Sequence, residues 1–155
     1  MGLDMFLLKE VYIGGQYSFN EVKGTIDLTV HGEQIDIPLN KLNSITLDVA
    51  YWRKANQVHN WFVNNVQDGN DDCGTYHVYG DKLKELVKLC KRILKLKETS
   101  LELAVQEAED LLPTCSGFFF GDTNYDEYYF EQLQDTIDQL KDVKDDETFI
   151  YHSSW

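Results

Sequence analysis

In the first fifty residues, hydrophobic and polar positions alternate, and turn residues interrupt the alternation. Residues 25–30 read Thr-Ile-Asp-Leu-Thr-Val, a period of two, and the His31-Gly32-Glu33 segment that follows is typical of a tight hairpin. The same pattern predicts strands near 9–13, 35–37 and 44–49. The N-terminal third is therefore predicted to form an antiparallel β-meander.

From residue 51 onward the hydrophobic period becomes helical. Four helices are expected, starting near residues 51, 81, 100 and 123, with Ser100 and Thr123 as N-caps of the last two. Short strands are expected at 75–79 and 118–120, and an edge strand at 148–151. The whole pattern predicts a single α+β domain over residues 1–155, in which the meander packs against about four helices.

Composition agrees with a globular protein. The chain has 155 residues, of which 43% are hydrophobic, so it can build a core, and it contains no apolar run of the roughly 20 residues that span a bilayer. Its start has neither a basic segment nor a small-residue cleavage site of the kind found in signal peptides. We therefore expect a cytoplasmic protein that does not bind membranes.

The charge of the chain indicates which class of partner it is able to bind. The net charge is −13, which argues against direct nucleic-acid binding, because that needs a surplus of lysine and arginine. Residues 82–100 hold 7 basic and 2 acidic residues, whereas residues 101–155 hold 14 acidic and 2 basic ones. An acidic flank of this kind favours association with a protein that has a basic surface, although it also suits a face that only interacts with solvent.

Catalytic signatures are missing from the sequence. The three cysteines, Cys73, Cys90 and Cys115, form no C-x-x-C pair, and their spacing from the histidines matches no familiar zinc site. The common nucleotide, hydrolase and metalloprotease motifs are absent, and the acidic loop 68–72 lacks the residues of an EF-hand. We predict no catalytic residue, no metal site and no cofactor, while the reactivity of Cys73 and Cys115 stays open.

Two segments contain candidate binding residues. Residues 51–62 combine two tryptophans, an Arg-Lys pair, a histidine and two asparagines, and residues 117–129 are rich in aromatics. Tryptophan and arginine together suit stacking on a base or a cation–π contact. The candidates are Trp52, Arg53, Lys54, Asn56, His59, Phe120, Tyr125 and Tyr128.

We expect Trp52, Arg53 and His59 to share an exposed pocket beside residues 118–125. In the alternative interpretation, the tryptophans lie in the core and Arg53 pairs with an internal carboxylate. The predicted fourth helix supplies a second set of candidates on its outward side, which are Glu131, Asp135, Asp138 and Asp142.

Several blocks of the chain resemble a known family. These blocks are spread over most of the sequence. They are the opening Met-Gly-Leu-Asp-Met, Tyr-Trp-Arg-Lys-Ala-Asn from residue 51, His-Asn-Trp-Phe-Val from residue 59, the loop at 67–73 and the segment 112–126 with its Gly-Phe-Phe-Phe-Gly core. Together they are similar to small acidic proteins that bacteriophages and prophages encode. That family has no assigned activity, so the resemblance implies a viral or mobile-element origin and transfers no catalytic residue.

Small acidic phage proteins, as a class, are frequently counter-defence factors, including anti-CRISPR proteins and nucleotide sponges. The leading hypothesis is therefore a non-enzymatic inhibitor of a bacterial host-defence component, which acts in the infected cell and mimics DNA charge against a basic nuclease or effector. The alternative is a sponge that sequesters a nucleotide-type signalling molecule between the tryptophan, arginine and histidine side chains. A homo-oligomer is compatible with both hypotheses.

Overall fold

The computed structural model of this protein describes residues 2–20 and 22–155. The chain divides into two compact units. Unit 1 comprises Met1–Leu8 and Asp48–Trp155, and unit 2 comprises Lys9–Leu47. The described residues form four α-helices, six strands and one short 3-10 helix, so the protein is a mixed α+β structure, as the sequence predicts.

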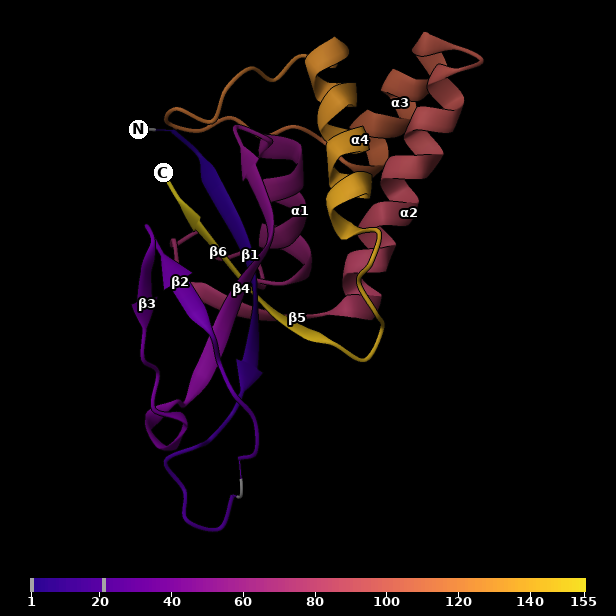
Figure 1. The fold of residues 1–155 in the computed structure, drawn as a ribbon. Helices are drawn as coiled ribbons and strands as arrows, with labels where there is room; N and C mark the ends of the chain where they lie inside the picture. The colour runs from indigo at the N-terminus through magenta and orange to yellow at the C-terminus, as the bar shows by residue number, and fades with distance from the viewer. Residues whose placement is uncertain (1, 21) are drawn as a thin grey trace. The chain divides into compact units, whose positions relative to one another are not determined.

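A four-stranded sheet runs in the order β4-β1-β6-β5 (Figure 1). Its strands are β1 (Asp4–Tyr12), β4 (Ser44–Arg53), β5 (Thr75–Tyr79) and β6 (Thr148–Ser154). β6 pairs antiparallel with both β1 and β5, so that Tyr151 lies opposite Leu7 on one side and Tyr76 on the other. The expectation that the tail forms an edge strand is wrong, because alternate residues of β6 are buried and the strand fills the middle of the sheet.

Helices α1 to α4 all belong to unit 1. Their bounds are α1 (Asn56–Asn65), α2 (Gly80–Lys97), α3 (Leu101–Leu111) and α4 (Glu127–Leu140). The Ser100 side chain accepts a hydrogen bond from the backbone N–H of Leu103, which confirms it as the N-cap of α3. Helix α4 is capped by Asp126, not by Thr123, because the Asp126 side chain accepts a hydrogen bond from the backbone N–H of Tyr129.

The first helix begins later than expected. Residues 51–53 continue β4, as the alternation of exposed Tyr51, buried Trp52 and exposed Arg53 indicates. Lys54 then turns the chain with a positive φ of 56°, and α1 starts at Asn56. Arg53 and Lys54 therefore lie before the helix and not in its first turn.

The aromatic segment at 118–120 does not form the buried strand that its composition predicts. Phe118 and Phe119 are 77% and 50% exposed, and only Phe120 is buried. The backbone explains the difference, because Phe119 adopts a positive φ of 66°, a conformation that interrupts an extended strand.

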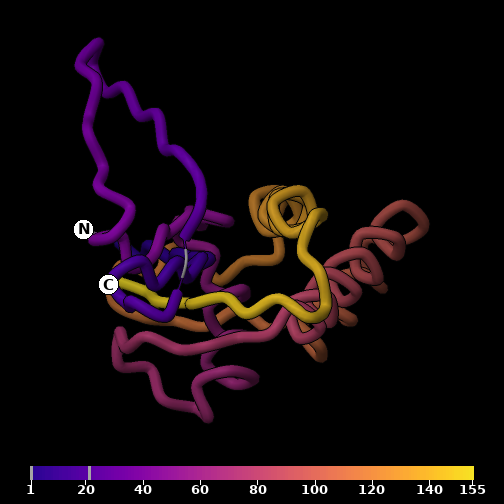
Figure 2. The backbone as a smooth tube through the Cα atoms, turned by 60° about the horizontal axis from the view of Figure 1, so that its bottom comes forward, coloured from indigo at the N-terminus to yellow at the C-terminus, as the bar shows by residue number. Residues whose placement is uncertain are grey.

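The core of unit 1 lies between the sheet and its helices. The rings of Phe62 from α1 and Tyr151 from β6 stack with centroids 3.8 Å apart. Helix α2 packs against both α3 and α4, and Figure 2 shows α4 nearly end-on beside α2. This arrangement fixes the outward faces of α2 and α4, on which the candidate surfaces lie.

Unit 2 contains a two-stranded sheet of its own, with strands β2 (Leu28–Val30) and β3 (Glu33–Ile35), and the 3-10 helix η1 (Leu39–Lys41). Val30 pairs with Glu33, and the two residues between them, His31 and Gly32, both have positive φ, which is the geometry of a tight hairpin. The predicted hairpin is therefore confirmed. Of the strands in the N-terminal third, β1 and β4 belong to the four-stranded sheet, and β2 and β3 form the two-stranded sheet.

Candidate functional site

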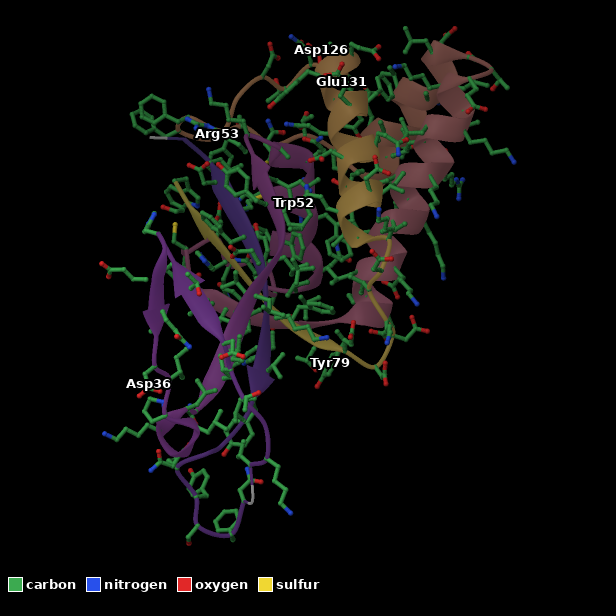
Figure 3. The ribbon with its side chains drawn as sticks, in the orientation of Figure 1. Asp36, Trp52, Arg53, Tyr79, Asp126 and Glu131 are labelled. Atoms are coloured by element: carbon green, nitrogen blue, oxygen red, sulfur yellow. The ribbon has the colours of Figure 1, made fainter. Side chains whose placement is uncertain are left out.

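A pocket of about 310 Å³ opens in unit 1 between the end of β4 and helix α4. Its lining residues are Tyr51, Trp52, Arg53, Ala55, Tyr128, Glu131, Gln132 and Asp135. Figure 3 labels Trp52 and Arg53 near the end of β4 and Glu131 on α4. The pocket thus combines members of both candidate sets, the aromatic and cationic residues after position 51 and the acidic residues of α4.

The alternation of β4 determines how its last residues take part. Trp52 is only 2% exposed and forms part of the core, and its indole N–H donates to the Thr136 hydroxyl at 3.0 Å. Arg53 points to the opposite side, where its side chain is 58% exposed and its Nε lies 4.0 Å from an Asp4 carboxylate oxygen. Arg53 is therefore an exposed residue with one distant acidic neighbour, not a buried and saturated ion pair.

Side chains of α4 bind the backbone at the end of β4. Gln139 accepts from the N–H of Tyr51 at 2.8 Å and donates to the Tyr51 carbonyl at 3.0 Å. The Tyr128 hydroxyl and the Gln132 amide both donate to the Arg53 carbonyl, at 3.2 and 3.3 Å. Because β4 is an edge strand, these bonds satisfy backbone groups that have no neighbouring strand, and they hold the walls of the pocket together.

The carboxylates of the pocket come from successive turns of α4. One Asp135 oxygen accepts from the Gln139 amide at 2.8 Å, so this carboxylate is held in place. Glu131 is exposed and has no ion pair or hydrogen-bond partner within residues 2–20 and 22–155. The pocket therefore contains two acidic groups and one cation, and the cation lies beside Asp4.

The same two residues begin a longer row of carboxylates on α4 and just beyond it. We call Glu131, Asp135, Asp138 and Asp142 the acidic stripe, since their spacing of four, three and four residues places them on one helical face. All four are exposed, and Asp138 accepts from Gln134 at 3.2 Å. Among the described residues, no ion pair includes a member of the stripe, so its four exposed carboxylates have no internal cation at ion-pair distance.

Helix α2 carries the opposite charge at the same spacing. We call Lys84, Lys88, Lys91 and Lys95 the lysine ridge. Lys84 pairs with Asp145 at 2.5 Å, and a groove of about 250 Å³ with an apolar floor of Val87, Ile137 and Leu140 lies beside the ridge. The unequal distribution of charge along the sequence therefore becomes two separate faces of unit 1.

His59 is not in the pocket. It is fully buried, with Nδ1 2.9 Å from the Tyr151 hydroxyl and Nε2 3.1 Å from an Asp71 carboxylate oxygen. Burial raises the pKa of Tyr151, so this phenol stays protonated at neutral pH. The expectation that Trp52, Arg53 and His59 share one exposed pocket is thus wrong for His59, because its ring faces the core side of α1.

Asn56 and Phe120 are internal residues as well. The Asn56 amide donates to the carbonyls of Phe120 and Asp122, at 3.3 and 2.8 Å, and accepts from the N–H of Cys115. Phe120 is 5% exposed and packs edge-on against His59. Both residues hold the 115–122 segment against α1.

Tyr125 and Lys54 do not line the pocket either. Tyr125 is partly buried, with its hydroxyl accepting from the N–H of Thr114 and its ring 4.9 Å from that of Tyr129. Lys54 is exposed at the turn before α1. The structure therefore brings together five of the predicted site residues, namely Trp52, Arg53, Tyr128, Glu131 and Asp135.

Three lining residues were not predicted: Tyr51, Ala55 and Gln132. Tyr51 had a usable signal, because in a strand the residue before a buried tryptophan is exposed on the other face. Gln132 follows Tyr128 by one helical turn, but a glutamine on a helix has no distinctive pattern. Its role depends on the long-range packing of α4 against β4.

Burial keeps two of the three cysteines, Cys115 and Cys90, in the thiol form. The Cys115 thiol donates to the Asn56 carbonyl at 3.3 Å, and burial raises its pKa to about 11, so it remains a thiol at neutral pH. Burial raises the pKa of Cys90 to about 12. Cys73 is exposed in its loop.

Neither metal ligands nor membrane spans are found in the part of the chain that the structure describes. Among these residues no three histidine, cysteine, aspartate or glutamate side chains gather in a way that could hold a metal ion, and no helix has the length and apolarity to cross a bilayer. Comparisons with protein-family models, curated proteins and solved structures found no match to this chain.

Proposed function

We propose that this chain is a non-enzymatic binding protein that uses the acidic stripe to occupy a basic, nucleic-acid-binding surface of another protein. The observation that carries the proposal is the row of four exposed carboxylates on one face of α4 and its C-terminal extension. Following the resemblance to phage proteins, we propose a bacterial host-defence nuclease or effector as the target and inhibition as the consequence.

The spacing of the acidic stripe supports mimicry of a nucleic-acid strand. At 1.5 Å per residue, the eleven-residue separation of Glu131 and Asp142 extends over about 16 Å, so the carboxylates follow one another at about 5.5 Å. One strand of B-DNA carries a phosphate for each 3.4 Å of axis, roughly. The linear charge density of the stripe is therefore somewhat below that of one strand and of the same sign, which suits a groove lined with lysine and arginine.

The stripe also keeps its charge unneutralised within the protein. The ion pairs of this region lie at the two ends of the α2–α4 contact, between Lys97 and Glu127 and between Lys84 and Asp145. Neither pair includes a residue of the stripe. An exposed, uncompensated row of charge steers a basic partner and speeds its association.

The alternative, sequestration of a nucleotide, has less support from the geometry of the pocket. His59 and Asn56 are enclosed in the core, Lys54 does not line the pocket, and Glu131 and Asp135 would repel a phosphate. Exposed aromatic rings remain on Tyr51 and Tyr128. A thermal-shift panel of cyclic and ADP-ribose-type nucleotides tests this alternative, since a ligand at about 100 times its Kd adds roughly 2.7 kcal/mol to stability.

The proposed function is tested by capture from a bacterial lysate with two matched variants. One variant reverses Glu131, Asp138 and Asp142 to lysine, and the other reverses Glu102, Glu109 and Asp110, which are exposed on α3. Both variants change the net charge by the same amount. We expect the wild type and the α3 variant to retain a basic nucleic-acid-binding protein that DNA displaces, and the stripe variant to lose it mainly through slower association.

Salt provides the second measurement. Raising the salt concentration from about 0.05 to 0.5 M should weaken the complex strongly, because exposed charges are screened over roughly 10 Å at 0.1 M. A captured protein whose binding is indifferent to salt, or that the two variants weaken equally, would contradict mimicry by the stripe.

A further inference from the structure

The pocket beside α4 has a chemistry of its own that charge mimicry does not require. Two exposed aromatic side chains, Tyr51 and Tyr128, line it above the buried Trp52, and two carboxylates, Glu131 and Asp135, lie at adjacent turns of the helix. Phosphate mimicry needs only exposed negative charge. Aromatic walls next to carboxylates are instead the combination that binds a cation with a flat, polarisable face.

The aromatic walls are fixed and accessible. Tyr128 is 50% exposed, and its hydroxyl donates to the Arg53 carbonyl, so the ring is held at the mouth of the pocket. Tyr51 is 45% exposed, and its hydroxyl is hydrogen-bonded to Asp4. Rings held in this way bind a stacked group with little loss of conformational entropy.

The polar groups of the pocket leave acceptors free. Glu131 has no partner among the described residues, and Asp135 uses one of its oxygens for Gln139. The cation of the pocket, Arg53, has its Nε 4.0 Å from an Asp4 carboxylate oxygen, which offsets part of its charge. An incoming cation therefore meets two carboxylates that are not saturated.

We propose that this pocket binds the guanidinium group of an arginine side chain from the basic partner, an inference that rests on the proposed function. A guanidinium is planar, stacks on aromatic rings and donates in a fork to carboxylates, whereas an ammonium is a compact and strongly hydrated charge. The volume of about 310 Å³ corresponds to about ten water molecules, which is enough for the end of one such side chain. The acidic stripe attracts the partner, and the pocket holds one of its arginines.

The proposal can be tested without the partner. Butylguanidinium is titrated into the ¹⁵N-labelled protein, and the Trp52 indole and the amides of Tyr128 and Glu131 are followed by NMR, with butylammonium and AMP as comparison ligands. We expect saturable, millimolar-range binding of butylguanidinium, at least about threefold tighter than that of butylammonium, and no binding of AMP.

Matched variants locate the binding. Glu131→Gln and Asp135→Asn should each weaken butylguanidinium about tenfold or more, because each removes an ionised hydrogen-bond acceptor. Asp138→Asn and Asp142→Asn remove the same charge from the same stripe, outside the pocket, and should change the Kd less than twofold. Tyr128→Leu should weaken binding about two- to fivefold through the lost cation–π contact.

Several results would overturn the proposal. These are no binding by the folded protein, equal affinity for butylammonium, preference for AMP, or equal weakening by the pocket and non-pocket variants. The two proposals fail separately. Binding of butylguanidinium without any basic partner in the lysate would reject the proposed function alone, and stripe-dependent capture without guanidinium binding would reject the arginine pocket alone.

Discussion

Helices α2 and α4 pack against each other, and their outward faces have opposite charge at the same spacing. The lysine ridge and the acidic stripe both step by four, three and four residues, yet they do not face each other. The two ion pairs of this region, Lys97–Glu127 and Lys84–Asp145, lie at its ends. Lys84, Lys88 and Lys91 line the groove between the two helices together with Ile137 and Leu140, but no ion pair among the described residues joins the lysine ridge to the acidic stripe.

The inward faces of the two helices are both apolar and buried in the core. Substitutions on these faces should have the largest effect on stability. Leu86 on α2 and Leu133 on α4 are both fully buried. Leu86→Ala and Leu133→Ala should each lower the free energy of unfolding by about 2–5 kcal/mol, measured by urea denaturation. Leu101→Ala, on the exposed side of α3, is the control and should cost less than about 0.5 kcal/mol. A tolerated change at either leucine would contradict the shared core.

A second variant tests the attachment of α4 to β4, which α2 does not have. The buried Thr136 hydroxyl accepts from the Trp52 indole N–H and donates to the Gln132 carbonyl. Thr136→Val keeps the shape but leaves the indole N–H unpaired, so we expect a loss of about 1–3 kcal/mol in chemical unfolding. Thr136→Ser retains the hydroxyl and should retain most of the stability. A larger loss in Thr136→Ser than in Thr136→Val would mean that packing of the methyl group, and not the hydrogen bond, matters.

The ion pairs at the ends of the two helices should contribute little. The Lys97 ammonium donates to both carboxylate oxygens of Glu127 and lies 4.6 Å from the centre of the Phe130 ring, but Glu127 is 71% exposed. A double-mutant cycle with Lys97→Met and Glu127→Gln should give a coupling of about 0.2–1 kcal/mol. Lys88→Met, in the middle of the ridge, should be close to neutral. A coupling well above this range would show that charge does join the helices.

The smallest effect on stability is expected from neutralising the exposed charges, and its sign should differ between the acidic stripe and the lysine ridge. Neutralising three acidic residues of the stripe with Gln or Asn makes the net charge less negative, whereas neutralising Lys88, Lys91 and Lys95 with Gln makes it more negative. We expect the first change to raise the free energy of unfolding, and with it the melting temperature, and the second to lower both. Each change should be no more than about 0.5 kcal/mol, because less self-repulsion favours the compact state. Both shifts should disappear at 0.5 M salt. Shifts of the same sign would contradict this electrostatic explanation.

Local patterns in the sequence were sufficient to predict the turns and helix caps, which depend on residues close together in the chain. The period of two before His31-Gly32 predicted the hairpin, and Ser100 predicted the start of α3, because turns and caps depend on residues a few positions apart. The outward position of the acidic stripe also follows from helical spacing. The opposite charges of residues 82–100 and 101–155 follow from their residue types alone.

Other features depended on contacts between distant parts of the chain. β6 occupies the middle of the sheet because β1 and β5 both pair with it, and a tail sequence cannot specify partners that lie so far away along the chain. Tyr51–Arg53 extend β4 because α4 side chains bind their backbone, which overrides the helical pattern that begins there.

The candidate site is divided in the same way. The sequence alone identified Trp52 and Arg53 as one set and Glu131 and Asp135 as another, and assigned His59 to the first. Only the tertiary structure joins the two sets in one pocket and encloses His59 in the core, because the packing of α4 against the end of β4 decides which side chains meet. Residue type and spacing determined which groups were available, and long-range packing determined which of them lie together.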